Sequence, residues 1–276
     1  MGYPMAQNIA KNFSLKSYNR SFNKMKGLEK SNIKLCTTLN DICKDVEVLI
    51  MMLPGDEEVL EIIYKIKDLL SEETTVIDMS STKVSTANEC YKILKKNKIN
   101  FLDAPVSGGP EGVKSASLAI MVGGDKKVFD SNKLIFNTLG KAMLVGPNGS
   151  GQLAKLCNQI IVGVTIGAVA EAVILCEKAG ANPENFIKAV AGGFADSKIL
   201  QNHGSRMIKK DFVPGGKSTT HLKDMNNILK CAEDVNIDLP ISKLIQGMYQ
   251  SIVDRGLGND DHSVLYKEII EYNKKN

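Results

Sequence analysis

The feature that most constrains the fold is a change of pattern at residues 146–151, where the stretch GPNGSG interrupts the chain. Before it, short β-like runs alternate with amphipathic segments, which is typical of a parallel sheet covered by helices. After it, the segments have the length and periodicity of helices. The sequence therefore predicts a doubly wound α/β domain over residues 1–148 and an all-α domain over residues 149–276, joined by a long helix.

The individual elements follow from the same patterns. The predicted strands are residues 15–19, 34–38, 46–53, 74–80, 99–105, 117–124 and 142–146. The predicted helices of the second domain are residues 152–179, 183–191, 196–209, 218–235, 240–254 and 261–273.

Composition narrows the expected partners and compartment. The chain has 35 basic and 31 acidic residues, and its lysines are scattered, so nucleic acid is not an expected partner. Six cysteines without CxxC spacing are typical of reduced thiols. The longest apolar stretch, residues 160–176, contains Glu171 and several glycines, so we predict a buried helix and no membrane partner. Because no signal-peptide pattern is visible, we expect a cytoplasmic protein.

The first predicted strand ends at Asn19, Arg20 and Ser21. A carboxylate at this place would accept hydrogen bonds from the ribose 2′-hydroxyl of NAD. These three residues offer no carboxylate, whereas the guanidinium of Arg20 can pair with a 2′-phosphate. We therefore expect NADP(H) as the preferred cofactor and NAD(H) as the alternative; a solvated surface arginine is the other role open to Arg20.

Two later strands run into loops at which a ligand is expected. The stretch MLPG contains Leu53 and Pro54, and DMSST contains Ser81. Ligands of open α/β sheets bind beyond the carboxyl ends of the strands. We predict that these three residues contact the cofactor, with ordinary turn and capping sequences as the alternative.

A glycine turn follows the predicted strand FLDAP. At Ser107, Gly108 and Gly109, the missing side chains let backbone N–H groups point at an anion. We predict that a small substrate carboxylate binds there.

Lys155 and Asn158, in the stretch GSGQLAKLCNQ, lie three residues apart and share one helix face. A lysine near the start of an apolar helix is partly desolvated beside the positive end of the helix dipole, and both effects disfavour its charged form. Lys155 is therefore a candidate general acid. A snorkelling lysine with a solvated head is the alternative.

Together these motifs resemble the β-hydroxyacid dehydrogenase family, also called 3-hydroxyisobutyrate dehydrogenase-like. The first residues, MGYPMAQN, resemble the end of its cofactor signature GLGxMGxxMxxN, with Gly2 as the third glycine and Met5 in the helix that follows. On this resemblance, Gly2 and Met5 bind the cofactor. The first strand and the two leading glycines of the signature are missing from this chain, so the Rossmann domain is expected to be truncated at its N-terminus.

The resemblance also implies roles for the later motifs. GSGQLAKLCNQ is similar to the catalytic segment GxGxxxKxxNN, in which the lysine, here Lys155, protonates the carbonyl oxygen and the asparagine, here Asn158, orients the substrate. Lys223 and Asp224, in HLKD, resemble a pair at the nicotinamide end of the cofactor. His221 is left with a packing or capping role.

The family resemblance implies an oxidoreductase that reduces a small aldehyde acid to the hydroxy acid. DAPVSGG, GGFADSKIL and GLGNDDHSVL are most similar to the branch that converts tartronate semialdehyde to glycerate. Ala116 stands where that branch generally has a glycine. The alternative activities are therefore those of a 3-hydroxyisobutyrate dehydrogenase and of a glyoxylate or succinic semialdehyde reductase. A homodimer or homotetramer is expected. The alternative of another class, a truncated nucleotide-binding or interaction module, gives no chemical reason to retain Lys155 and Asn158.

Overall fold

A computed structural model describes residues 1–275 of the chain. The chain divides into two compact units, Met1–Lys155 and the residues from Leu156 onward, called unit 1 and unit 2 below. The division falls within the long helix α8 (Ser150–Lys178), so that its first turn and a half belong to unit 1.

The described part of unit 1 contains two sheets. The strands β1 (Leu15–Ser17) and β2 (Ile33–Leu35) form a parallel pair. The second sheet is six-stranded, has the order β3-β4-β5-β7-β6, and carries β8 beside β7. Its strands are β3 Val48–Met51, β4 Thr75–Asp78, β5 Asn100–Asp103, β6 Val106–Ser107, β7 Leu118–Gly124 and β8 Gly140–Gly146.

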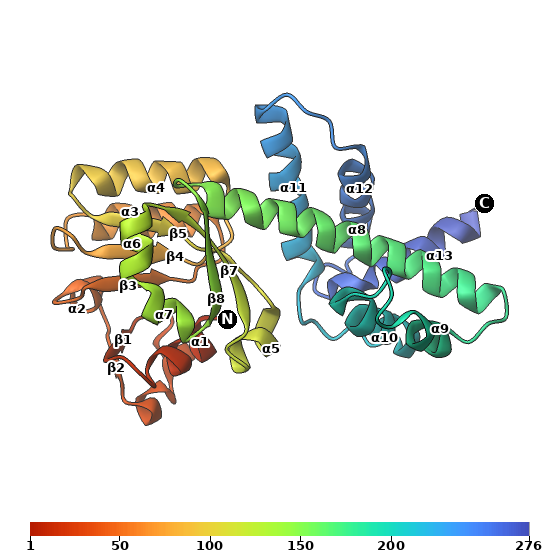
Figure 1. The fold of residues 1–276 in the computed structure, drawn as a ribbon, viewed down its shortest axis with the longest axis horizontal. Coiled ribbons are helices and arrows are strands. Elements are labelled where there is room, and N and C mark those ends of the chain that lie inside the picture. The colour runs from red at the N-terminus through yellow and green to blue at the C-terminus, as the bar shows by residue number, and fades with distance from the viewer. Residues whose placement is uncertain (276) are drawn as a thin grey trace. The chain divides into compact units, whose positions relative to one another are not determined.

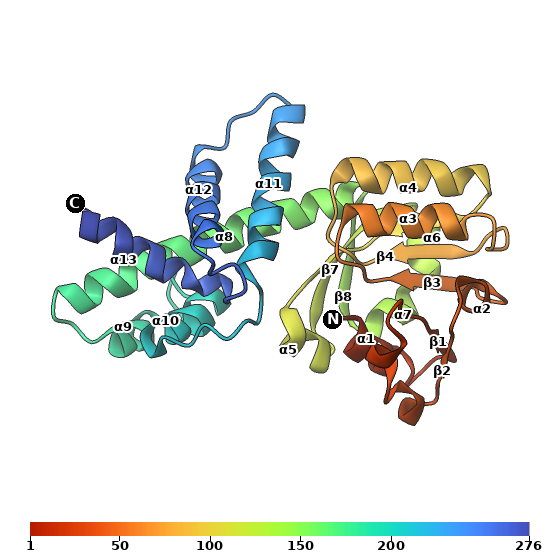
Figure 2. The same cartoon turned by 180° about the vertical axis from the view of Figure 1, so that it is seen from behind.

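Helices cover both faces of the larger sheet (Figures 1 and 2). One apolar cluster joins β3, β4 and β5 to α2, α3 and α4, and a second joins β4, β5 and β7 to α1, α5, α6 and α7. The helices of unit 1 are α1 Gly2–Ile9, α2 Leu39–Cys43, α3 Asp56–Ile66, α4 Val84–Lys96, α5 Gly109–Lys114, α6 Lys126–Ser131 and α7 Lys133–Asn137, with the 3-10 turns η1 Phe22–Met25 and η2 Leu28–Ser31. The three layers are those of a Rossmann-like fold.

Each predicted strand overlaps a strand of the structure, and the predicted α/β class is confirmed. The strands β3, β4 and β5 pair in parallel as predicted, whereas β7 runs antiparallel to both β5 and β6. Parallel pairing needs a connection that crosses over the sheet. Residues 104–117 instead turn back through the short strand β6, which was not predicted, and the six-residue helix α5.

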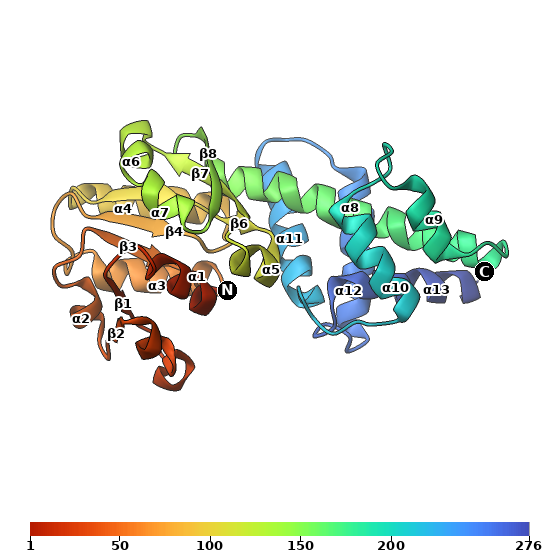
Figure 3. The ribbon, with the colours of Figure 1, turned by 60° about the horizontal axis from the view of Figure 1, so that its bottom comes forward.

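Unit 2 is helical throughout its described elements (Figure 3). After α8 come α9 Pro183–Val190, the π-helical turn η3 Leu200–Gly204, α10 Ser205–Lys209, α11 Ser218–Asp234, α12 Pro240–Asp254, the 3-10 turn η4 His262–Val264 and α13 Leu265–Lys275. A Cβ added at Gly163 would lie 2.6 Å from the His221 ring, and one at Gly167 would lie 2.8 Å from Ile245. The glycines therefore let the backbone of α8 pack closely against α11 and α12.

The helix α8 is long and apolar enough to cross a membrane by length and composition alone. Core helices of globular proteins pass the same test. In unit 2 this helix buries Ile166, Ala170 and Val173 completely, whereas Ile161 and Leu175 are exposed, so the predicted buried helix is buried on one side only.

Candidate cofactor and substrate site

The helix α1 begins at Gly2 with no acidic side chain in its first turn. A Cβ added at Gly2 would lie 3.6 Å from Met52 Cβ, an ordinary van der Waals contact. The free N–H groups at the start of a helix attract anions such as a pyrophosphate, and no carboxylate of the first turn opposes this here. The N-terminus of α1 thus suits the phosphates of a dinucleotide.

The loops after β3 and β4 lie at the carboxyl ends of neighbouring parallel strands. The amide of Leu53 donates a 2.9 Å hydrogen bond to Ser80 Oγ, which ties the first loop to the second. Asp56 Oδ1 adds a further tie, since it accepts from the amide of Lys83 at 2.8 Å. Pro54 is exposed and Ser81 half-buried on the loops so joined, where a bound ligand can reach them.

The end of β1 presents polar groups to solvent. Asn19 Oδ1 accepts a 2.9 Å hydrogen bond from the amide of Ser21, so that these residues form a local turn around Arg20. Arg20 is exposed and no carboxylate belongs to this turn. The free start of α1, the linked loops and the polar turn after β1 are together compatible with a nicotinamide dinucleotide.

Two residues with predicted roles are buried in a core. Met5, a predicted cofactor contact, is only 2 % exposed and belongs to the apolar cluster that contains Ile77 and Met79. His221, for which packing was predicted, is 2 % exposed, and its ring centroid lies 4.6 Å from that of Tyr249. The side chain of Met5 therefore packs inside unit 1 instead of lining its surface.

The turn at Ser107 has the backbone that its glycines allow. Gly108 has φ +132° and Gly109 has φ +61°, values that residues with a Cβ adopt at a cost. Ser107 ends β6 opposite Ala119 and is half-buried, whereas both glycines are exposed. The exposed N–H groups of such a turn suit a small anion.

Lys155 is 9 % exposed, which is rare for a lysine, and it lies near the start of α8. The first turn of α8 is anchored by a carboxylate from β5. Asp103 Oδ1 accepts from the amide of Gly149 at 2.7 Å, and its Oδ2 accepts from the amide of Gln152 at 2.9 Å. Asp103 pairs in register with Asp78 on β4, and burial raises the pKa of each carboxyl to about 6.

In unit 2, four polar side chains form one connected series. Asn158 Nδ2 donates to Gln159 Oε1 at 2.8 Å, and Gln159 Nε2 donates to Asp224 Oδ2 at 2.7 Å. Lys223 Nζ lies 3.4 Å from Asp224 Oδ1. The structure therefore brings Asn158, Lys223 and Asp224 together, and Gln159, the departure from the usual second asparagine, is the bridge between α8 and α11.

Sequence reasoning missed the buried residues that hold these groups, namely Asp103, Gln152, Ser80 and Gln159. Asp103 lies in the FLDAP stretch from which only the following turn was used. Gln152 lies three residues before Lys155 on the same helix, and that spacing was the available signal.

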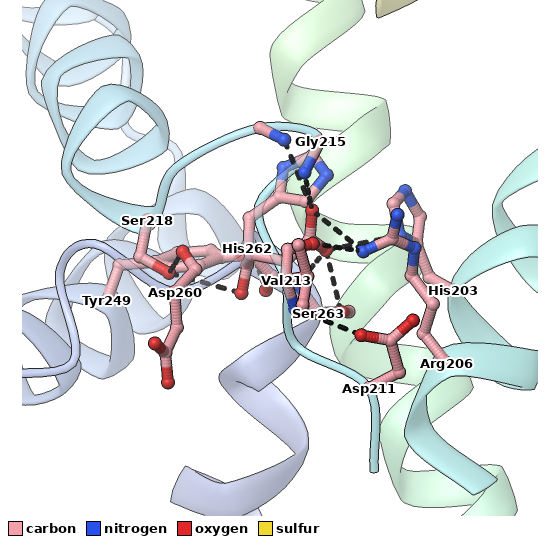
Figure 4. A network of polar contacts seen from close by, with 12 residues as sticks. His203, Arg206, Asp211, Val213, Gly215, Ser218, Tyr249, Asp260, His262 and Ser263 are labelled. Carbon is pink, nitrogen blue, oxygen red and sulfur yellow. Dashed lines mark hydrogen bonds and ion pairs between the residues drawn. The ribbon is translucent and has the colours of Figure 1, made fainter. Parts of the chain in front are cut away.

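A second polar cluster surrounds the fully buried Asp261 in unit 2 (Figure 4). Its Oδ1 accepts from the hydroxyl of Ser263 at 2.7 Å, and its Oδ2 accepts from the amides of Gly215 and Gly216 at 2.8 and 3.1 Å. Burial opposes ionisation, but the hydrogen bonds outweigh it and leave the pKa of Asp261 below its usual range. The carboxylate thus joins the loop before α11 to the start of η4.

The three histidines of the chain gather beside this carboxylate. Donor atoms of His203, Asp261 and His262 lie within 4.8 Å of one another, a spacing that could hold a metal ion. However, Arg206 Nη1 lies 3.5 Å from Asp261 Oδ2, and both carboxylate oxygens already accept hydrogen bonds. Because a guanidinium beside the carboxylate repels a cation, the cluster fits a structural anchor better than a metal site.

Comparison with known proteins shows the family of the chain. Residues 1–147 match the family model described as the NAD binding domain of 6-phosphogluconate dehydrogenase, and residues 149–269 match that described as NAD-binding of NADP-dependent 3-hydroxyisobutyrate dehydrogenase. The chain is 37% identical over 236 residues to 2-hydroxy-3-oxopropionate reductase of Escherichia coli (strain K12), covering 84% of this chain and 81% of that protein. The chain belongs to the β-hydroxyacid dehydrogenase family.

Further comparisons support the same family and fold. An uncharacterized oxidoreductase of Bacillus subtilis (strain 168), YkwC, is 33% identical over 272 residues, covering 97% of this chain and 94% of that protein. The structure of Mycobacterium tuberculosis 3-hydroxyisobutyrate dehydrogenase with L-serine has a TM-score of 0.89 at 24% identity, covering 98% of this chain and 95% of that chain. As a β-hydroxyacid dehydrogenase, the protein is an NAD(P)-dependent oxidoreductase that acts on the hydroxyl group of a small hydroxy acid.

Proposed function

We propose that this β-hydroxyacid dehydrogenase reduces tartronate semialdehyde to glycerate with NADPH. The observation that carries the proposal is the burial of Lys155 near the start of the apolar helix α8. A lysine is among the side chains that can serve as a general acid when they are positioned against the reacting group. The similarity to a 2-hydroxy-3-oxopropionate reductase supports the substrate, and the exposed Arg20 after β1 supports NADPH.

In the proposed reaction, some residues orient the substrate and Lys155 transfers the proton. When bound, the nicotinamide supplies the hydride that reduces the aldehyde carbon. Ser107 and the N–H groups of Gly108 and Gly109 hold the substrate carboxylate, and Asn158 orients the substrate. Lys155 Nζ donates a proton to the carbonyl oxygen, so that hydride and proton together convert the aldehyde to a primary alcohol.

The proposal assigns most of the cofactor contacts to unit 1. Gly2 contacts the phosphates at the start of α1, the helix that also carries Met5, and Leu53, Pro54 and Ser81 contact the cofactor from the loops after β3 and β4. Asn19, Arg20 and Ser21 surround the adenosine ribose, with Arg20 on the 2′-phosphate of NADPH. Lys223 and Asp224 serve the nicotinamide end.

An oligomer of two or four copies in the cytoplasm is part of the proposal. The outward face of α8 supports oligomerisation, because Leu153, Ile161 and Leu175 are 46%, 65% and 71% exposed. Apolar side chains in one exposed stripe are typical of a surface that a second chain covers.

The test is NADPH oxidation by the purified chain with tartronate semialdehyde, against glyoxylate, succinic semialdehyde and methylmalonate semialdehyde, repeated with NADH. Tartronate semialdehyde and NADPH should give the highest kcat/KM. Lys155→Met should lower kcat at least about 100-fold, the usual contribution of a general acid. Lys178→Met, which removes an exposed lysine at the other end of α8, is the matched control and should not change kcat. Turnover that survives in Lys155→Met would contradict the role of this lysine, and preference for another aldehyde acid would contradict the substrate.

A further inference from the structure

The helix that carries Lys155 is anchored by a residue of the sheet, Asp103. Asp103, at the end of β5, has no exposed surface, and its two carboxylate oxygens accept from the amides of Gly149 and Gln152 at 2.7 and 2.9 Å. Charge-assisted hydrogen bonds to helix N–H groups are strong and directional. The first turn of α8 is therefore fixed relative to β5, and Lys155 follows Gln152 by one helical turn.

The side chain of Gln152 continues this connection to the loop after β4. It is fully buried, its Nε2 donates to the carbonyl oxygen of Ser80 at 2.9 Å, and its Oε1 accepts from the amide of Thr82 at 3.0 Å. The side-chain amide of Gln152 is therefore bonded to the residue before Ser81 and to the residue after it. A carboxamide is the side chain that can donate to one backbone group and accept from another in this way.

The connection reaches the loop after β3 through Ser80. Ser80 is fully buried, and its hydroxyl accepts from the amide of Leu53 at 2.9 Å. Its own amide donates to Asp78 Oδ1 at 3.0 Å, which holds the serine in place. An unbroken series of hydrogen bonds, buried except for the part-buried last one, therefore runs from Asp103 through Gln152 and Ser80 to Leu53.

We propose that Asp103 and Gln152 are positioning residues that keep the helix bearing Lys155 in register with the loops after β3 and β4. The consequence for catalysis rests on the function proposed above, in which these loops hold the cofactor and Lys155 donates the proton. Hydride donor and proton donor must meet the same carbonyl group, and a misplacement of about 1 Å can lower the rate about 100-fold. Neither residue touches substrate or cofactor in this proposal.

The first test is hydrogen exchange of the full chain without added cofactor. Gln152→Met keeps a similar volume but can neither donate nor accept as the amide does. The amides of Thr82 and Leu53 should exchange at least about tenfold faster in this variant, because the first loses its acceptor and the second is held through Ser80. Unchanged exchange at both amides would overturn the proposal, whether or not the chain turns over any aldehyde acid.

The matched control is Asn132→Leu in the same unit. Asn132 is also buried, at 5 % exposure, and its Nδ2 donates to the carbonyl oxygen of Val128 at 2.8 Å, away from this series. Asn132→Leu removes a comparable hydrogen bond and should leave the exchange rates of the Thr82 and Leu53 amides as they are in the natural chain. Faster exchange at both amides in the control would mean that they report general destabilisation, which would also overturn the proposal.

The second test is kinetic and uses Gln152→Glu. A protonated Glu can donate to Ser80 and accept from Thr82, whereas an ionised one repels the Ser80 carbonyl, and burial beside Asp103 and Asp78 favours protonation. With wild type that reduces tartronate semialdehyde, Gln152→Met should lower kcat about 100-fold with little change in KM. The ratio of Gln152→Glu to wild-type kcat should rise as the pH falls from about 8 to about 6. A ratio independent of pH, with kcat of Gln152→Met unchanged, would overturn the positioning role, whereas wild type that is inactive on every aldehyde acid would overturn the proposed function alone.

Discussion

At the scale of single residues, the start of α8 depends on Gly151. A Cβ at this position would meet the carbonyl oxygens of Asp103 and Met121, the latter at 2.5 Å, and Asp103 Oδ2 at 2.9 Å. These atoms belong to β5 and β7, which cannot move as a flexible side chain would. The approach of helix to sheet that lets Asp103 reach the amides of α8 therefore requires glycine here.

Gly151→Ala should lower the free energy of unfolding by about 3 kcal/mol, because overpacking against backbone forces helix and sheet apart. Urea unfolding at constant pH measures the change. Gly247→Ala is the matched control: nothing lies within 4 Å of its added Cβ, and alanine should stabilise α12 by up to about 1 kcal/mol. Equal effects of the two substitutions would show that the contact with β5 and β7 is not what constrains Gly151.

At the scale of elements, Asp261 holds two segments of unit 2 together. Ser263 at the start of η4 and the Gly215–Gly216 turn before α11 all donate to this one carboxylate. An amide in its place would put a donor against one of these N–H groups. Asp261→Asn should therefore destabilise unit 2 by about 2 to 4 kcal/mol.

The neighbouring Asp260→Asn is the control for this prediction. Asp260 is about one-third exposed, at 35%, and lies 3.7 Å from Lys267 Nζ, so its loss should cost less than about 1 kcal/mol. The two variants differ by one position and have the same change of charge. The measurement is the midpoint of urea unfolding of unit 2. Equal shifts of this midpoint in Asp261→Asn and Asp260→Asn would contradict an anchoring role for Asp261.

The elements were predictable to different degrees, for physical reasons. Strands such as β3 and β4 and the long helix α8 could be predicted because apolar periodicity is a local property of the sequence. The two-residue strand β6 could not, because it is held by its pairing with β7 and has no pattern of its own. For the site, the glycine turn at Ser107 could be expected from its motif, whereas the connection of Asn158 to Asp224 through Gln159 could not, because it joins two motifs far apart in the sequence. Gln152 acts through residues 70 or more positions away, and one sequence carries no local signal of such contacts.

At the scale of the whole molecule, the two units should respond to acid in opposite directions. In unit 2, burial and the neighbouring histidines lower the pKa of His262 from 6.5 to about 3. Between these two pH values the unfolded chain binds a proton at His262 and the folded chain does not. The contribution of His262 to the stability of unit 2 is therefore fully present above pH 6.5 and is lost as the pH falls toward 3. Between pH values of about 6.5 and 4.5 this histidine alone should cost unit 2 about 2 kcal/mol.

In unit 1, burial raises the pKa values of Asp78 and Asp103 from 3.8 to about 6. Here the folded chain binds protons that the unfolded chain does not bind until the pH approaches 3.8. Unit 1 should therefore gain stability as the pH falls from about 6 to about 4, by about 2 kcal/mol for each carboxyl if they titrate independently. Because the pair lies in register on adjacent strands, the combined gain should be smaller than the sum.

Hydrogen-exchange protection factors at pH values of about 6.5 and 4.5 can follow both units in one sample. On acidification, protection should fall in α11 and α12 of unit 2 while it holds or rises in β4 and β5 of unit 1. His262→Gln removes one titrating ring and should weaken the response of unit 2 without changing that of unit 1. If both units lost protection in parallel, in the natural chain and in the variant alike, the buried groups named here would not govern the acid response. Because His262 lies in unit 2 and Asp78 and Asp103 are buried in unit 1, we expect acid to unfold unit 2 while β4 and β5 stay folded.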